Sequence, residues 1–275
     1  MLVREFFWPP ATIPLDMPMD LLIVGVTRRG DGRSFIGFGS VGPGRTGFVR
    51  LVAPTPSGVL YPQEYQTYGV WEPRRWDLVR VEAPWADSRP MQPENRILDR
   101  TPWELLERPA SARWLGELER HPVARGALLG TRGRAVREAS VQMAGSVAYV
   151  EPADVTAVCE WDPQRERYRA RLHFSLDGER YDLALSDCFY SPVIARKPEA
   201  TYTLEQVGCR APHGLRLLIS LGEPFHGWCY KTVAGILPRR TVTLMRDGTS
   251  STLSSTDRHA AGDTLEHPRS SVVGT

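Results

Sequence analysis

Hydrophobic and polar positions divide the chain into two strand-rich stretches, with a more polar segment between them. In the first stretch, residues 21–27 form a continuous apolar run, which is typical of a strand that is buried on both faces. Further strands are predicted at residues 33–40, 48–53 and 76–82. Gly37 and Gly39 lie inside the first of these, where glycine indicates the bulges or tight coiling of a small barrel.

The second strand-rich stretch contains a strand with regular alternation at residues 167–174. Its apolar positions are expected to share one face, at Tyr168, Ala170, Leu172 and Phe174. Its basic positions are expected to share the other, at Arg169, Arg171 and His173. Asp177-Gly178 then predicts a tight hairpin turn, so the chain should return at once as a neighbouring strand. Other strands are predicted at residues 156–161, 215–221 and 228–237.

The segment between the two stretches carries helix signals. The sequence Thr-Pro-Trp-Glu predicts a helix start, because Thr101 can cap the free amides, Pro102 suits the first position and Glu104 can complete a capping box. Ser111 is expected to begin a second short helix. The arginine- and glycine-rich residues that follow predict a linker.

Together these patterns predict a mainly β protein with two small barrels or sandwiches joined by short helices. The expected divisions are a proline-rich N-terminal arm at residues 1–19, a first barrel at 20–100, short helices and linker at 101–140, a second barrel at 141–240 and a flexible tail at 241–275. The tail is polar and should be disordered after a short strand at residues 241–245.

Composition narrows the classes of function without selecting one. The chain has 275 residues and a formal net charge of +2, so any basic surface must arise from local segregation of charge. No secretion signal and no apolar run long enough to cross a membrane are present, so we expect a cytoplasmic protein with no membrane contact. The four cysteines lack a Cys-x-x-Cys spacing and are expected to be reduced and buried.

Four segments carry distinctive motifs. The first two are Thr-Arg-Arg at residues 27–29 with Gly32, Arg33 and Gly37, and Phe-Val-Arg at 48–50 with Pro54. The third contains Gln-Pro-Glu-Asn at residues 92–95, and the fourth runs from Gly-Glu-Pro-Phe at 222–225 to Cys-Tyr-Lys at 229–231. Together these segments resemble a bacterial family of proteins built from two OB-fold-like barrels, the dual OB-containing domain, and the Gln-Pro-Glu-Asn and Cys-Tyr-Lys elements are the more specific. The resemblance implies two OB-like barrels over about residues 20–240 and an association with bacterial defence or mobile-element neighbourhoods. OB folds commonly bind single-stranded nucleic acid.

Three groups of residues are candidates for contact with nucleic acid. The basic strand face of Arg169, Arg171 and His173 could follow a phosphate backbone, because each guanidinium offers paired donors. A second group combines arginines near the first turn with an aromatic ring, at Arg28, Arg29, Arg33, Arg50 and Phe35. Trp228, Tyr230 and Lys231 form a third, weaker group, from which Tyr230 and Lys231 are selected as candidates. The alternatives are a solvated strand face for the first group, a core position for Phe35 and an apolar stem with an exposed amine for Lys231.

Metal binding and catalysis have weaker signals. Cys209, His213, His226 and Cys229 have a spacing compatible with zinc, although two of them border or lie in predicted strands. The chain has no nucleophile elbow, no phosphate-binding loop and no dinucleotide fingerprint, so we expect no cofactor and no enzymatic activity.

The sequence therefore favours a non-catalytic accessory protein that binds single-stranded DNA or RNA, such as a subunit of a bacterial defence or repair assembly. The alternative hypothesis is a protein-interaction adaptor without nucleic-acid contact, and a metal-dependent enzyme is the third. A protein partner in a larger complex is compatible with the first two.

Overall fold

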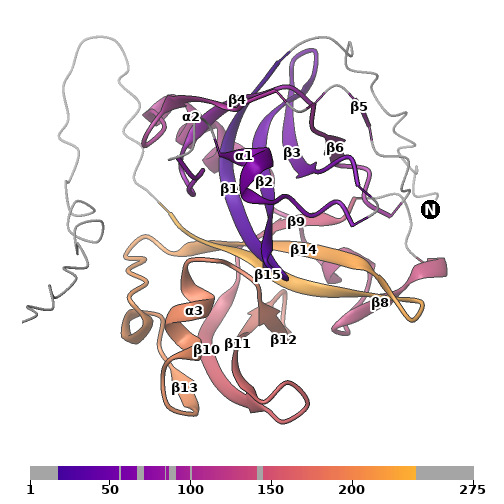
Figure 1. Ribbon diagram of the computed structural model, residues 1–275. Helices are drawn as coiled ribbons and strands as arrows, with labels where there is room; N and C mark the ends of the chain where they lie inside the picture. Colours follow the sequence, from indigo (N-terminus) through magenta and orange to yellow (C-terminus); the bar gives the residue numbers. More distant parts are fainter. Residues whose placement is uncertain are drawn as a thin grey trace, which may run out of the picture.

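The computed structural model describes residues 18–239, apart from residues 56, 67–70, 84, 87–90, 100 and 141–144 and the side chains of residues 85 and 86. The predicted N-terminal arm up to residue 17, the short strand at 241–245 and the polar tail lie outside the described residues. The described part forms two β-sheets that pack against each other, so the predicted mainly β class is confirmed (Figure 1). The hydrogen-bonded path of each sheet is open and does not form a closed ring.

The first sheet has seven strands in the order β5–β6–β3–β2–β1–β4–β7. Their bounds are β1 Met19–Arg29, β2 Gly32–Gly42, β3 Arg45–Val52, β4 Leu78–Val81, β5 Trp85–Ala86, β6 Asn95–Ile97 and β7 Glu104–Glu107. The short helix α1 (Pro62–Tyr65) brings Tyr65 into the core of this sheet. There the ring of Phe35 meets Tyr65 and Trp103 edge-on, with 5.1 Å between ring centroids in each pair.

The second sheet has eight strands, with β13–β10–β11–β12–β15–β14–β9 along its path and β8 paired to β15. Their bounds are β8 Ala135–Arg137, β9 Val147–Val150, β10 Ala153–Asp162, β11 Arg167–Leu176, β12 Glu179–Leu185, β13 Ala200–Tyr202, β14 Leu215–Phe225 and β15 Trp228–Pro238. Asp177 and Gly178 form the predicted turn between β11 and β12, and both have positive φ.

The two sheets repeat one arrangement that the sequence did not reveal. Each contains a three-stranded antiparallel meander, β1–β2–β3 in the first sheet and β10–β11–β12 in the second. The third strand of each meander then pairs in parallel with a later strand, β3 with β6 and β12 with β15. The chain therefore contains two structural repeats.

Strand β1 is buried on both faces because each face packs on a different core. Leu21 and Ile23 belong to the core of the first sheet, whereas Leu22 and Val24 belong to a cluster shared between the sheets. That cluster includes Leu218 and other residues of the second sheet. The continuous apolar run of β1 thus reflects its position between two cores.

The sheets are also joined through the backbone. Thr27 at the end of β1 forms an isolated β-bridge with Asp187, and the amide of Cys188 donates to the carbonyl of Val26 at 2.8 Å. The amide of Arg28 donates to Ser186 at 3.4 Å. The segment after β12 therefore extends the end of β1.

The prediction of a helix that starts at Thr101 is wrong, because this segment joins the first sheet as β7 and pairs with β4. Trp103 is buried in the first core, so the free energy of burying a large ring outweighs the local capping pattern. The second predicted helix is confirmed as α2 (Ala112–Arg120), which begins after Ser111 and packs Leu118 into the shared cluster.

Part of the predicted linker is ordered into the second sheet. It contains the 3₁₀ turns η1 (Leu128–Gly130) and η2 (Glu138–Ser140), and between them β8 pairs with the start of β15. The first sheet extends beyond residue 100 through β7. Helix α3 (Tyr190–Ala195) and the turn η3 (Glu205–Val207) complete the elements. Across the described segments, no helix has the length and apolar character needed to span a bilayer.

Candidate nucleic-acid interface

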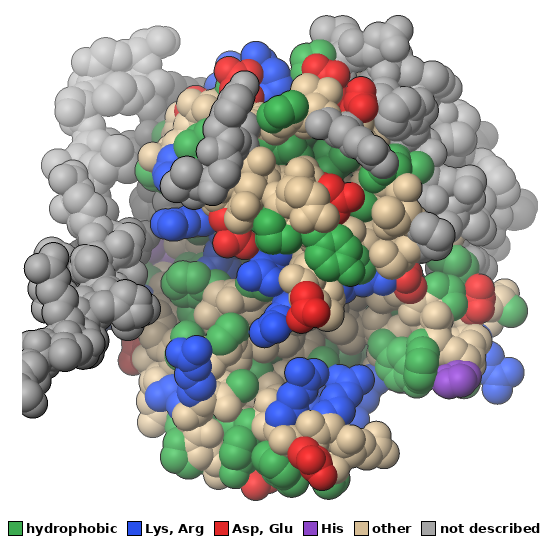
Figure 2. All heavy atoms as spheres, viewed as in Figure 1, with side chains coloured by type: hydrophobic (Ala, Val, Ile, Leu, Met, Phe, Trp, Pro, Cys, Tyr) green, Lys and Arg blue, Asp and Glu red, His purple; other side chains and the backbone are tan. Residues whose placement is uncertain are grey.

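Basic side chains gather along the boundary between the two sheets on the face shown in Figure 2, with acidic side chains among them. In the turn between β1 and β2, Arg29 pairs with Glu223 at 2.6 Å and Arg33 pairs with Glu72 at 3.2 Å. Arg28 is exposed and donates to a backbone carbonyl of its own turn. Among the described residues, no carboxylate lies within ion-pair distance of Arg28. Of these three predicted arginines, Arg28 is thus the one best placed to meet a phosphate.

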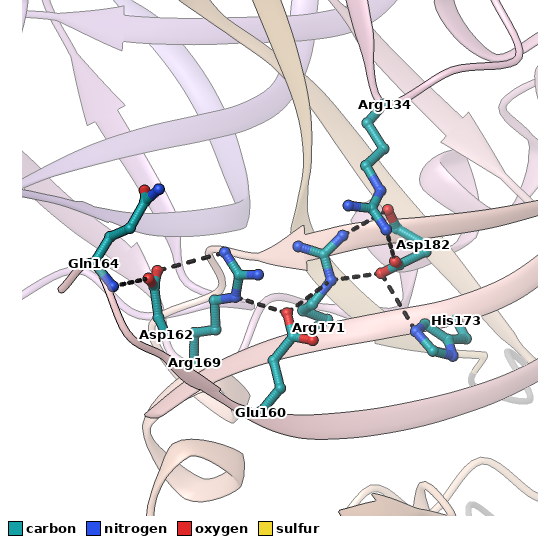
Figure 3. Close-up of polar contacts among 8 residues, drawn as sticks. All are labelled: Arg134, Glu160, Asp162, Gln164, Arg169, Arg171, His173 and Asp182. Carbon is teal, nitrogen blue, oxygen red and sulfur yellow. Dashed lines mark hydrogen bonds and ion pairs between the residues drawn. The ribbon is translucent and has the colours of Figure 1, made fainter. Parts of the chain in front are cut away.

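The predicted basic face of β11 is occupied by ion pairs (Figure 3). Arg169 Nε lies 2.6 Å from a carboxylate oxygen of Glu160, and Arg171 Nε lies 2.5 Å from Asp182. His173 Nε2 lies 3.3 Å from the same Asp182. The three basic residues share a face as predicted, but Arg171 is buried and all three are held by carboxylates of neighbouring strands. The predicted basic face therefore does not offer unpaired cations to a phosphate backbone.

Asp182 is the centre of this network. Burial opposes ionisation of its carboxyl group, but the hydrogen bond from Arg171 and the charges of Arg171, Arg134 and His173 outweigh this effect and lower the pKa of Asp182. Arg134 reaches Asp182 from the segment before β8. The network thus joins the segment before β8 to strands β10, β11 and β12, and it stabilises the second sheet.

The apolar face of the same strand also differs from the prediction at one position. Ala170, Leu172 and Phe174 are buried as expected, but Tyr168 is exposed. It lies near the end of the β10–β11 hairpin, where it meets the exposed ring of Trp161 edge-on at 5.1 Å. This part of the hairpin extends past the core, so alternation no longer determines burial there.

Arg50 and Phe35 lie inside the molecule. Phe35 is fully buried in the first core, as its alternative reading predicted. Arg50 is buried between the sheets, where its guanidinium donates to Ser220 Oγ at 2.7 Å and to Asn95 Oδ1 at 3.3 Å. The prediction that Arg50 faces a ligand is corrected, because its donors are used within the interface between the sheets.

The Gln-Pro-Glu-Asn segment completes this contact, and we name Arg50, Gln92, Glu94 and Asn95 the inter-sheet clasp. Gln92 Nε2 donates to the carbonyl of Leu221 at 3.0 Å, while Gln92 Oε1 accepts from Asn95. The carboxylate of Glu94 accepts from the amide and hydroxyl of Ser146 and from a second amide at 3.1 Å. Arg50, Gln92 and Glu94 therefore bind backbone and side-chain groups of the second sheet, and Asn95 bonds to Arg50 and Gln92.

The β14–β15 hairpin carries an exposed aromatic surface. The exposed fraction of the residue is 63% for Phe225, 38% for Trp228 and 48% for Tyr230. Trp228 and Tyr230 share one face of β15 because they alternate with buried Cys229. Arg137 of β8 pairs across from Trp228, and its guanidinium carbon lies 5.2 Å from the centroid of that ring system. We name Phe225, Trp228, Tyr230 and Arg137 the aromatic hairpin face.

The aromatic hairpin face lies next to the first turn of the other sheet. The ion pair between Arg29 and Glu223 joins the end of β1 to β14, two residues before Phe225. Figure 2 shows hydrophobic side chains beside a histidine and basic side chains at the end of the β14–β15 hairpin. The arginines of the first turn and the aromatic hairpin face thus lie on neighbouring segments at the boundary between the sheets, whereas the β11 network belongs to the second sheet alone. Sequence reasoning missed Phe225 and Arg137, and weighed Trp228 without selecting it.

Lys231 is buried, contrary to the prediction of an exposed binding residue. It follows Tyr230 in β15 and therefore points to the opposite face, into the second sheet. Its ammonium group donates to the carbonyl and hydroxyl of Thr131 at 2.6 and 2.8 Å and to the carbonyl of Gly133 at 2.8 Å. The nitrogen also lies 5.8 Å from the ring centroid of Tyr181. Lys231 thus holds the segment before β8 against the sheet.

Burial lowers the pKa of Lys231 from 10.5 to about 8. Between these values the unfolded chain binds more protons at this position than the folded chain, so the free energy of unfolding should rise with pH. At about 1.4 kcal/mol per pKa unit, the rise is about 3 kcal/mol at most. We expect the difference in unfolding free energy between the wild type and Lys231→Met to increase from pH 7.5 to 10 in urea titrations. A pH-independent difference would contradict a perturbed lysine.

The zinc constellation is not assembled. Cys209 is buried in the core of the second sheet, Cys229 is buried beneath the aromatic hairpin face, and His226 lies in the hairpin turn. Burial raises the pKa of both thiols, which disfavours the thiolate that zinc requires. Within the described part of the chain, no group of three or more His, Cys, Asp or Glu residues could hold a metal ion.

The comparison with known families agrees with the two structural repeats. Residues 19–236 match the dual OB-containing domain, and this match covers strands of both sheets. No curated protein matches the chain. A meander whose third strand pairs in parallel with a later strand occurs in each repeat, as expected of partly open OB barrels. The chain therefore belongs to the dual OB-containing domain family.

Proposed function

We propose that this protein binds single-stranded nucleic acid without catalysing a reaction, and that the aromatic hairpin face is the principal contact. The observation that carries the proposal is the exposure of three aromatic rings beside Arg137 on one side of the β14–β15 hairpin. Exposed rings on a strand are suited to base stacking, which needs no particular base sequence. The role would be that of an accessory subunit in a larger assembly.

The charges favour binding dominated by stacking. Arg28 and Arg137 have no carboxylate within ion-pair distance among the described residues, whereas Arg29 and Arg33 are already paired. About two phosphate contacts would give a slope of log affinity against log salt of about −1.4 for a single strand. Fluorescence polarisation with 16-nucleotide DNA and RNA strands over a salt series measures this slope. A slope steeper than about −4 would contradict a stacking-dominated interface.

Trp228→Ala is expected to weaken binding of the 16-nucleotide strand by about 5- to 150-fold, because one base–aromatic stack contributes about 1–3 kcal/mol. Trp161→Ala is the matched control, since Trp161 is similarly exposed, at 43%, but lies on the β10–β11 hairpin. The control should bind like the wild type. Equal affinities for Trp228→Ala and the wild type would exclude this face as the binding site.

The same surface would also suit a protein partner, because Trp, Tyr and Arg dominate the centres of protein interfaces. Capture of partners by the wild type, repeated after nuclease treatment, separates the two functions. Suppose that the captured partners remain bound after nuclease treatment, that their capture depends on Trp228, and that no free strand binds at low salt. The protein is then an adaptor and the nucleic-acid proposal is refuted.

A further inference from the structure

The segment after β12 presents a second exposed aromatic ring at the boundary between the sheets. Phe189 is 58% exposed and directly precedes α3. Its backbone is held in place by a hydrogen bond, in which the Phe189 amide donates to Asp187 Oδ1 at 2.7 Å. The guanidinium carbon of Arg75 lies 5.1 Å from the Phe189 ring centroid, and the ring meets Tyr190 edge-on at 4.9 Å. A large ring is thus held in place while much of its surface remains in solvent.

The segment that carries Phe189 is paired with the end of β1. The backbone of residues 186–188 continues the end of β1 through its hydrogen bonds to Val26 and Arg28. In this pairing Arg28 lies opposite Ser186, three residues before Phe189, and Arg29 pairs with Glu223 of β14. The end of β1 therefore contacts the two segments that carry the aromatic sites.

Strand β15 shows how the two aromatic sites are placed. It pairs with β12 on one side and with β14 on the other, so Phe189, which follows β12, and Phe225, which ends β14, lie on segments at opposite sides of β15. Phe225 pairs opposite Trp228 at the start of β15, whereas Asp187 accepts from the amide of Ile236 near its end. The eight residue steps from Trp228 to Ile236 span about 26 Å at about 3.3 Å per residue.

We propose that a single strand of nucleic acid crosses the boundary between the two barrels, with bases stacked on the aromatic hairpin face at one end and on Phe189 at the other. Arg28 would meet the backbone between them. The inference rests on the proposed function and adds to it a second stacking site and a minimum length. At about 3.4 Å per stacked nucleotide, the separation corresponds to about eight nucleotides.

The test compares strands of four and sixteen nucleotides, because a four-nucleotide strand is too short to occupy both ends. Phe189→Ala is expected to weaken binding of the sixteen-nucleotide strand by about 5- to 150-fold, the effect of one base–aromatic stack. It should leave binding of the four-nucleotide strand, measured by competition, unchanged. Trp228→Ala should weaken binding of both strands.

Two further variants separate stacking from general packing. Phe189→Trp should bind the long strand at least as well as the wild type, and Phe189→Leu should bind it like Phe189→Ala. Val193→Ala is the matched control, since Val193 is 43% exposed on the adjoining helix α3 and should have no effect. Melting temperatures confirm that each variant is folded.

If Phe189→Ala binds the long strand like the wild type while Trp228→Ala does not, the path across both barrels is refuted and the hairpin site stands. If Phe189→Leu binds the long strand like the wild type, stacking on this ring is refuted. If the wild type binds no strand at low salt, the proposed function fails and this inference fails with it.

Discussion

Replacing Arg50 by methionine should lower the free energy of unfolding by about 3 kcal/mol, which corresponds to a fall of about 6–12 °C in melting temperature for a chain of this size. Methionine retains the apolar stem but removes every donor of the guanidinium. Ser220 Oγ, Asn95 Oδ1 and the carbonyls of Ser146 and Leu221 would lose a charged partner inside a buried interface. The two carbonyls keep a second donor, from the Leu221 amide and from Gln92, so the loss falls mainly on Ser220 Oγ and Asn95 Oδ1, where water cannot replace the buried hydrogen bonds.

Arg80→Met is the matched control for this variant. Arg80 lies in the same sheet and pairs with Asp20 at 2.7 Å, but this ion pair is exposed to solvent, so its loss should cost much less than the loss of Arg50. Urea unfolding followed by tryptophan fluorescence compares the two. We further expect Arg50→Met to broaden the transition, because the clasp couples the barrels. Equal midpoints for both variants would show that the clasp contributes little to stability.

Local sequence patterns were sufficient to predict a strand where that strand depends on its own alternation and on a nearby turn. The β11–β12 hairpin is the best example, because Asp177 and Gly178 both adopt the positive φ that the tight turn needs. The apolar run of β1 likewise predicted a strand buried on both faces. The sequence could not indicate that one of those faces packs on the other sheet, because that partner lies about 200 residues away.

Local patterns misled where a distant contact decides the outcome. Residues 101–104 contain every element of a helix start, yet β4 offers hydrogen bonds and the first core accommodates Trp103. The basic residues of β11 illustrate the same limit for charge. Arg171 and Arg169 alternate as a phosphate-binding strand would, but Asp182 and Glu160 on the neighbouring strands pair with them. A pattern within one strand carries no information on the charges of the next.

The Gln-Pro-Glu-Asn segment shows why polar motifs are difficult to interpret from sequence. Side chains next to proline most often bond their own loop, and Asn95 does donate to Gln92 at 2.9 Å. Gln92 and Glu94, however, also reach the second sheet more than 50 residues away. The sequence offered one indication of this contact, the family resemblance. Both the Gln-Pro-Glu-Asn segment and the Phe-Val-Arg segment that contains Arg50 belong to it.

Asp187→Ala should destabilise the protein by about 3–5 kcal/mol, because this buried carboxylate satisfies four donors. Oδ1 accepts from the amides of Phe189 and Tyr190 at 2.7 and 3.1 Å. Oδ2 accepts from Arg75 at 2.9 Å and from the amide of Ile236 at 3.1 Å. Alanine would leave three amides and a largely buried guanidinium without this acceptor, at the point where the segment after β12 meets both β1 and β15.

A double-mutant cycle with Arg75→Met separates the ion pair from the amide contacts. Because Arg75 and Asp187 contact each other directly, the double variant should lose less stability than the two single losses added together. Asp20→Ala provides a control in which Arg80 loses a partly exposed aspartate partner, at a cost of less than about 1 kcal/mol. If Asp187→Ala costs no more than Asp20→Ala in urea unfolding, Asp187 does not hold the two barrels together, and the fixed position of Phe189 must depend on the packing of its ring against Tyr190 and Arg75 instead.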